Sequence, residues 1–130
     1  MRKVTRKSLV ASLDKAFSIW VRSSPADHRG FSQCFTCGQF MHWKTMDAGH
    51  FQSRAKMSTR WAELNVKPQC KRCNGFRGGE QFIFARHLDR VHGTGTSEEI
   101  EILSNTTRKW SMDELREMKE HYQAKIKELE

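Results

Sequence analysis

The sequence predicts a small α+β protein in which helices at both ends flank a loop-rich centre held together by a metal ion. Three observations lead to this fold class. Apolar residues recur at helical spacing in residues 8–22, 80–92 and 111–129, the periodicity fades between Asp27 and Gly79, and four cysteines lie inside that aperiodic stretch. A chain of 130 residues is long enough for one domain, which we place at 1–130.

The first helix is predicted over residues 8–22. Its apolar positions recur at intervals of three and four: Leu9, Leu13, Phe17 (or Ala16) and Trp20. Ser8 is a suitable N-cap, and Pro25 ends the helix because the residue before a proline avoids the helical region. We interpret this segment as a core-facing helix in which Trp20 packs rather than recognises a ligand.

Two more helices follow the central stretch. Helical spacing returns in residues 80–92, and the segment 93–97, rich in glycine and threonine, would form a stop and a linker. The last helix, 111–129, opens with Ser111 and Glu114 at the spacing of a capping box. Its apolar stripe would pack on the core or form a dimer face: Leu115, Met118, Tyr122, Ile126 and Leu129.

Charge is distributed unevenly along the chain. Residues 1–97 hold 17 Lys/Arg and 6 Asp/Glu, whereas residues 98–130 hold 6 and 9, within a net charge of +8. A basic body favours a polyanionic partner, nucleic acid first, although ordinary solubilising charge is the alternative. No run of about 18 apolar residues exists to span a membrane, and the start does not read as a signal peptide. We therefore expect no membrane partner and a cytoplasmic location.

The four cysteines form two C-x2-C pairs. Cys34 and Cys37 are separated by 32 residues from Cys70 and Cys73, which is typical of a four-cysteine zinc site. Two disulfides are the alternative, which a reducing compartment disfavours. Four thiolates leave no open coordination position, so the predicted zinc is structural and any chemistry must come from other residues.

Polar residues suited to metal-assisted phosphodiester hydrolysis lie between and beside the cysteine pairs. Asp47 and Asn74 offer the oxygen ligands that hard divalent cations prefer, and His50 could accept a proton from an attacking water. From the residues alone the alternative stays open: His50 as a structural histidine and Asn74 as a turn residue.

The order of the motifs strengthens the first interpretation. It is carried by four segments: Cys34-Phe-Thr-Cys37-Gly38, Ala48-Gly-His50-Phe51, Asn65-Val-Lys-Pro-Gln-Cys-Lys-Arg-Cys-Asn74, and Gly79 leading into 80–92. This order resembles the HNH (His-Me finger) nucleases and, more narrowly, the NinG/Rap recombination nucleases of lambdoid phages, over residues 10–93. The resemblance implies a ββα-metal core over residues 31–93 beside the structural Zn²⁺. The resembled proteins are longer, with an additional N-terminal segment that contains cysteines.

The resemblance also implies a role for each polar residue. His50 matches the general base, Asn74 matches a ligand of the catalytic ion, Mg²⁺ or Mn²⁺, and Asn65 matches the asparagine that braces the loop and orients the base. Asp47 is the expected second ligand. Many HNH enzymes carry the acidic ligand directly before the histidine, where this chain has Gly49.

The function implied is a metal-dependent DNA endonuclease of HNH type that acts on branched DNA such as Holliday junctions, in the host-cell cytoplasm if a phage encodes it. A non-catalytic zinc-ribbon-like nucleic-acid-binding module and a sequence-specific homing or restriction HNH nuclease are the alternatives. Paired cuts make a homodimer the expected assembly, through 8–22 and 111–129. Basic residues expected to contact DNA phosphates surround the site: Arg54, Lys56, Arg60, Lys67, Lys71, Arg72 and Arg77.

Overall fold

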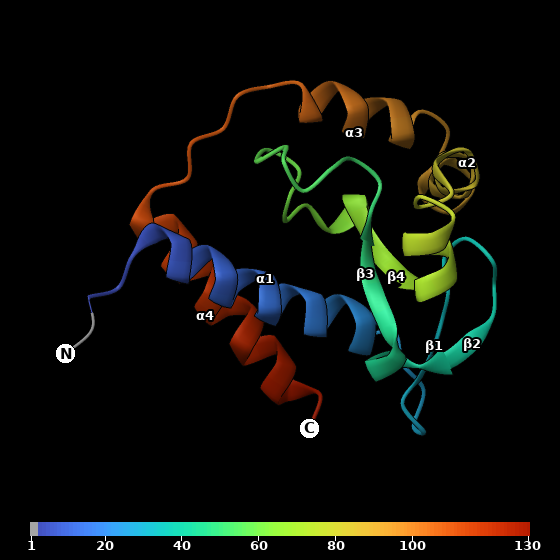
Figure 1. The fold of residues 1–130 in the computed structure, drawn as a ribbon, viewed down its shortest axis with the longest axis horizontal. Coiled ribbons are helices and arrows are strands. Elements are labelled where there is room, and N and C mark those ends of the chain that lie inside the picture. Colours follow the sequence, from blue (N-terminus) through green and yellow to red (C-terminus); the bar gives the residue numbers. More distant parts are fainter. Residues whose placement is uncertain (1–2) are drawn as a thin grey trace.

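The computed structural model describes residues 3–130 and arranges them as helices around two small β-hairpins (Figure 1). The elements are α1 (Arg6–Ser23), β1 (Phe31–Gln33), β2 (Phe40–His42), β3 (Met46–His50), β4 (Val66–Cys70), α2 (Gln81–His92), α3 (Thr96–Ser104) and α4 (Met112–Glu128). Both hairpins are antiparallel, β1 with β2 and β3 with β4. The predicted α+β class and the three predicted helices are confirmed.

The hairpin β3–β4 is the element that carries the polar residues of interest. In its register Asp47 lies opposite Gln69, and His50 lies opposite Val66. A π-helical turn, Arg72–Phe76, follows β4 and leads toward α2. The chain therefore runs strand, strand, helix through this region, and the long loop between the strands spans residues 51–65.

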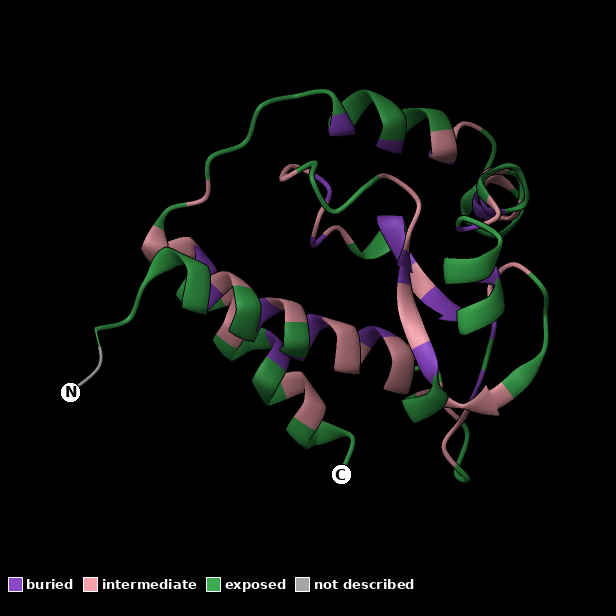
Figure 2. Cartoon of the chain, viewed as in Figure 1, coloured by how far each residue is buried: buried purple, intermediate pink, exposed green. Residues whose placement is uncertain are grey.

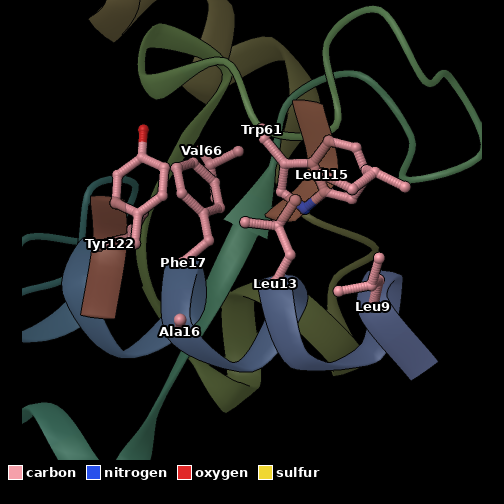
Figure 3. Packing of buried hydrophobic residues seen from close by; sticks show 9 residues of the cluster. Leu9, Leu13, Ala16, Phe17, Trp61, Val66, Leu115 and Tyr122 are labelled. Carbon is pink, nitrogen blue, oxygen red and sulfur yellow. The ribbon is translucent and has the colours of Figure 1, made fainter. Parts of the chain in front are cut away.

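The main core forms where α1 packs against both α4 and the hairpin β3–β4 (Figures 1 and 3). Its buried side chains are Leu9, Leu13, Ala16, Phe17, Val21, Trp61, Val66, Leu115 and Tyr122. The rings of Phe17 and Tyr122 meet edge to face at 4.9 Å, and burial of each large apolar side chain is worth about 1.5–3 kcal/mol. The stripe of α4 therefore serves the core of its own chain at Leu115 and Tyr122, while Leu129 at its end is exposed.

A second, smaller core joins α2 to α3 through Phe84, Leu88 and Ile100. The sequence did not predict α3, because its nine residues bury little apolar surface (Figure 2). Its first turn is held from another helix: the Asp89 carboxylate accepts from the backbone N–H of Ser97 at 2.8 Å and from its hydroxyl at 3.1 Å. A helix stabilised by a distant cap is invisible to local sequence patterns.

The helix ends follow capping chemistry. α1 begins two residues earlier than predicted, because Thr5 rather than Ser8 is its N-cap and the two residues bond reciprocally as a capping box. Ser111 and Glu114 form the predicted capping box of α4, and Gly93 ends α2 as predicted.

None of the helices within residues 3–130 combines the length and apolar character needed to cross a bilayer.

Asp14 on α1 ties the 51–65 loop to the core. Its carboxylate accepts from Arg60 Nη2 at 2.6 Å and from Trp61 Nε1 at 2.9 Å. Burial alone would raise the pKa of Asp14, but the hydrogen bonds from Arg60 and Trp61 outweigh it and hold the pKa below 3.8. The ionised carboxylate is therefore the form that anchors this loop.

We expect Asp14→Asn to lower the free energy of unfolding by about 1–3 kcal/mol, the usual value of a hydrogen bond to a charged group. Because the folded-state pKa is depressed, this contribution is present above the unfolded pKa of about 3.9 and is lost as the pH falls through the folded value. Urea unfolding of the original protein and of Asp14→Asn, at pH 7 and at pH 3, measures this contribution to the free energy of unfolding. The difference between the two proteins should shrink at the lower pH, and an equal difference at both would contradict this account.

Candidate active site and metal centre

The four cysteines converge on one point between the two hairpins. Their Sγ atoms all lie within 4.8 Å of one another, and all four thiols are free. The Sγ atoms of Cys37 and Cys70 are 3.8 Å apart, which is the edge of a tetrahedron with metal–sulfur bonds of about 2.3 Å. The cluster could hold an ion such as zinc, as predicted. Among residues 3–130 it is the one group of three or more His, Cys, Asp or Glu side chains close enough to do so.

Backbone amides favour thiolates in this cluster. The N–H of Cys70 donates to Cys34 Sγ at 3.3 Å, and that of Cys73 donates to Cys70 Sγ at 3.4 Å. Burial would raise the pKa of Cys34, but hydrogen bonds from the backbone of Cys70 and Cys37 lower it to about 6. Burial instead raises the pKa of Cys73 to about 12. Four thiolates at this spacing need a cation to ionise together.

The cluster lies next to the polar residues because they share β4 and the turn after it. Cys70 ends β4, and Asn74 directly follows Cys73 in the π-helical turn. Gln69 adds a second link that the sequence analysis missed. Its buried Nε2 donates to Thr36 Oγ1 of the first cysteine loop and to the carbonyl of Gly79, each at 3.0 Å.

Asp47 and Asn74 are brought into direct contact. Asn74 Nδ2 donates to Asp47 Oδ2 at 3.0 Å, and Lys71 Nζ lies 2.7 Å from Asp47 Oδ1. Burial would raise the pKa of Asp47, but the hydrogen bonds from Lys71 and Asn74 lower it below 3.8. Asp47 is therefore a carboxylate at neutral pH, with an ammonium group resting against one of its oxygens.

His50, at the end of β3, is held by the 51–65 loop. Its Nε2 lies 2.9 Å from the carbonyl oxygen of Arg60. A carbonyl can only accept, so Nε2 carries the proton of the neutral ring and Nδ1 keeps a lone pair. Burial lowers the pKa of His50 below 6.5, while the carbonyls of Arg60 and Ala48 act in the opposite direction. The ring is therefore neutral and oriented at pH 7.

Asn65 braces the loop that holds His50. Its side chain is fully buried, with Oδ1 accepting from the N–H of Gln52 at 2.7 Å. Its Nδ2 donates to the carbonyls of Thr59 at 2.9 Å and Gln52 at 3.1 Å. Asn65 thus holds the 51–65 loop together, and the Arg60 carbonyl of that loop orients His50. Asn65 itself is not among the residues that line the pocket.

Asp47, His50 and Asn74 line one open pocket of about 600 Å³. Four cationic side chains share its lining: Arg22, Lys44, Arg54 and Lys71. Arg22 and Ser18, from α1, were missed because we assigned that helix to the core alone. They lie four residues apart, and Arg22 Nε donates to the Ser18 carbonyl at 3.0 Å. Two polar residues at that spacing on an amphipathic helix were the signal available in the sequence.

Two of the seven basic residues predicted to contact DNA line this pocket, and the other five lie elsewhere. Arg54 and Lys71 line it, whereas Arg72 and Arg77 are exposed on the turn after β4, with Arg77 3.5 Å from Glu80. Lys56 bonds to Asn105. Arg60 is engaged by Asp14, with its side chain only 14% exposed, so it positions the loop instead of offering a free charge. Lys67 lies against His92 and lines a different pocket.

Gly49 stands before His50 because Gln69 fills the space a side chain would need. A Cβ at position 49 would lie 1.8 Å from Gln69 Oε1 and 2.8 Å from its Cγ. Gln69 cannot easily move, since its amide bonds to Thr36 and Gly79. This contact excludes an acidic ligand at position 49 and leaves Asp47 as the carboxylate of the pocket.

We expect Gly49→Ala to destabilise the protein by about 1–3 kcal/mol, the usual cost of overpacking a filled interior. Adding Gln69→Ala to the same chain should recover part of that loss, which urea unfolding of the single and double variants measures. If the losses of stability from Gly49→Ala and Gln69→Ala were additive in the double variant, a clash with Gln69 would not explain the effect of Gly49→Ala.

The fold and the cysteine cluster define a small α+β protein with a candidate four-cysteine metal site beside a cationic pocket. The chain belongs to the family described as bacteriophage lambda NinG protein, which matches residues 2–130. Protein ninG of Escherichia phage 933W is 30% identical, with 88% of this chain and 60% of that protein covered. Protein ninG of Escherichia phage lambda is 29% identical, with 88% and 59% covered, and that of Salmonella phage P22 is 27% identical, with 88% and 60% covered. The chain thus spans about 60% of the length of these curated relatives. No solved structure gives a significant match.

Proposed function

We propose that this protein is a metal-dependent DNA endonuclease of the HNH type that cuts branched DNA such as Holliday junctions. The observation that carries the proposal is one cationic pocket lined together by Asp47, His50 and Asn74. The strand–strand–helix order around them and the adjacent cysteine cluster support the HNH assignment. Membership of the NinG family supports the branched substrate, which the motif resemblance to recombination nucleases implies.

The residues of the pocket suit a hard divalent ion, Mg²⁺ or Mn²⁺. Asp47 would supply a carboxylate oxygen, and Asn74, whose Nδ2 donates to Asp47 Oδ2 at 3.0 Å, would supply its amide oxygen. The Lys71 ammonium rests on Asp47 Oδ1 and is 68% exposed, so it can swing away when a cation takes that carboxylate. When bound, the ion would neutralise the charge that develops on the leaving 3′ oxygen.

His50 would act as general base. Its Nδ1 lone pair can accept the proton of the water that attacks the phosphorus, while the Arg60 carbonyl fixes the ring through Nε2. The neutral ring, favoured by burial, is the form that this role needs. Attack in line with the 3′ oxygen leaves a 5′ phosphate on the product.

The surrounding cations would hold the scissile phosphate. Arg22 and Arg54 approach the pocket from α1 and from the loop, and both can contact phosphate oxygens without reading a base. We therefore expect recognition by backbone charge and shape, with little sequence specificity. Paired cuts in a junction would take two copies of the chain, so we propose a homodimer on branched DNA.

Two other functions are distinguishable from this one. A non-catalytic zinc-ribbon-like module would account for the cysteines and the charge but would give no role to the Asp47, His50 and Asn74 set. A sequence-specific homing or restriction HNH nuclease would use the same pocket, and would cut one fixed position of a duplex.

The test is cleavage of a labelled four-way junction and of a linear duplex of matched sequence at low salt, with Mg²⁺, with Mn²⁺ and with no added divalent ion. Metal-dependent cutting that favours the junction is the expected result. Equal cutting of both substrates would remove the branched-DNA preference. A single cut site in the duplex would favour the sequence-specific enzyme, and binding without cutting under any ion would leave the zinc-stapled binding module.

A further inference from the structure

Two phenylalanines that are close in sequence to pocket residues are the most exposed large apolar side chains in the described part of the chain. Phe76 is 92% exposed and Phe82 is 84% exposed. Phe76 lies two residues after Asn74, and Phe82 follows Gln81, and both Asn74 and Gln81 line the pocket. Large aromatic side chains left in water next to a functional pocket indicate a surface that something covers.

Four exposed arginines belong to the same turn and helix as these two phenylalanines: Arg72, Arg77, Arg86 and Arg90. Phe82, Arg86 and Arg90 follow one another at four-residue intervals, so they share one face of α2. Of the two acidic residues nearby, Asp89 is engaged by Ser97 of α3, and Glu80 lies 3.5 Å from Arg77, so Arg72, Arg86 and Arg90 are the arginines without a nearby carboxylate partner among the described residues. We call this surface, the two phenylalanines and the four arginines, the aromatic ridge.

The side chains of the ridge indicate what kind of ligand would bind there. The arginines favour an anionic partner, and the phenylalanines favour flat apolar surfaces on which they can stack. A fully paired duplex meets only the first requirement, because its base faces are stacked inside the helix. A second copy of the chain meets only the second requirement, since a symmetric contact would set its phenylalanines against these rings but its arginines against these arginines.

We propose that the aromatic ridge binds unpaired nucleobases of DNA, with Phe76 and Phe82 stacking on bases while the arginines contact the adjacent phosphates. This inference rests on the proposed function, and it specifies the feature of branched DNA that the protein recognises. Bases unstacked at a branch or in a single-stranded segment would lie on the ridge, and the neighbouring phosphodiester would enter the pocket.

Binding is measured by fluorescence anisotropy on two DNAs of equal length, one with an unpaired segment and one fully paired, using the His50→Ala chain without added divalent ion. Phe76→Ala and Phe82→Ala should each weaken binding to the DNA with unpaired bases by about tenfold. Binding to the duplex should change by no more than about twofold, because phosphate contacts dominate there. Phe82→Trp should retain the affinity, since tryptophan also stacks.

Phe40→Ala is the matched control, because Phe40 is 65% exposed on β2 and lies outside the ridge. Equal losses on both DNAs, no loss on either, or a loss as large from Phe40→Ala would overturn the proposal. So would a change in sedimentation from dimer to monomer in the phenylalanine variants, which would make the ridge a contact between copies. Cleavage by the chain with His50 intact reports separately on the proposed function, so either idea can fail while the other stands.

Discussion

His50→Ala is expected to reduce metal-dependent DNA cleavage by about 10²–10⁴-fold, the usual contribution of a positioned general base. Binding of the junction should stay nearly unchanged, because His50 is neutral and half-buried and supplies no charge to a phosphate. Single-turnover cleavage and anisotropy on the same DNA separate the two effects.

His121→Ala is the matched control for this change. His121 is exposed on α4 and packs only on Tyr122 among aromatic neighbours, outside the residues that line the pocket. Full activity in His50→Ala would remove His50 as the base. A loss of binding equal to the loss of cleavage would make its role structural.

The pH dependence of cleavage gives an independent check on His50. Burial lowers its pKa below 6.5, so the ring keeps its lone pair to lower pH than an exposed histidine does. The acid limb of the cleavage rate should therefore have its midpoint below pH 6.5. A midpoint above that value would assign the limb to another group.

If the four cysteines hold a structural ion, its removal is expected to unfold the region around both hairpins. Structural zinc sites of this kind contribute about 10–16 kcal/mol in apparent binding free energy, which is comparable to the entire stability of a small domain. Dialysis against a strong chelator should abolish the cooperative thermal transition seen by circular dichroism, and Zn²⁺ rather than Mg²⁺ should restore it. Elemental analysis should find one zinc ion per chain.

Two serine variants separate a ligand role from simple packing. Cys73 is buried and Cys37 is exposed, so a packing role would make Cys73→Ser costly and Cys37→Ser nearly neutral. A ligand role predicts that both variants lose the ion and destabilise the protein by similar amounts. A stable, zinc-free Cys37→Ser protein would argue against the four-cysteine site.

Local sequence patterns were sufficient to predict α1 and α4 but not α3. The apolar spacing of Leu9, Leu13 and Phe17 determined α1 and the face it buries, because a helix places residues three and four apart on one side. The Ser111–Glu114 pair set the start of α4 for the same local reason. α3 was missed because its first turn is capped by Asp89, a residue of another helix.

The sequence by itself determined which residue types could do chemistry here: two C-x2-C pairs whose spacing suits one tetrahedral ion, and an Asp, a His and two Asn in the order of a known motif. Only the tertiary structure decided which side chains meet around them. It engaged Arg60 with Asp14, brought Arg22 from α1 into the pocket, and set Gln69 against Gly49 so that Asp47 remains as the pocket's carboxylate. The physical reason is that ligand spacing within a turn is local, whereas charge pairing and steric exclusion depend on segments that meet only when α1 packs on the hairpin β3–β4.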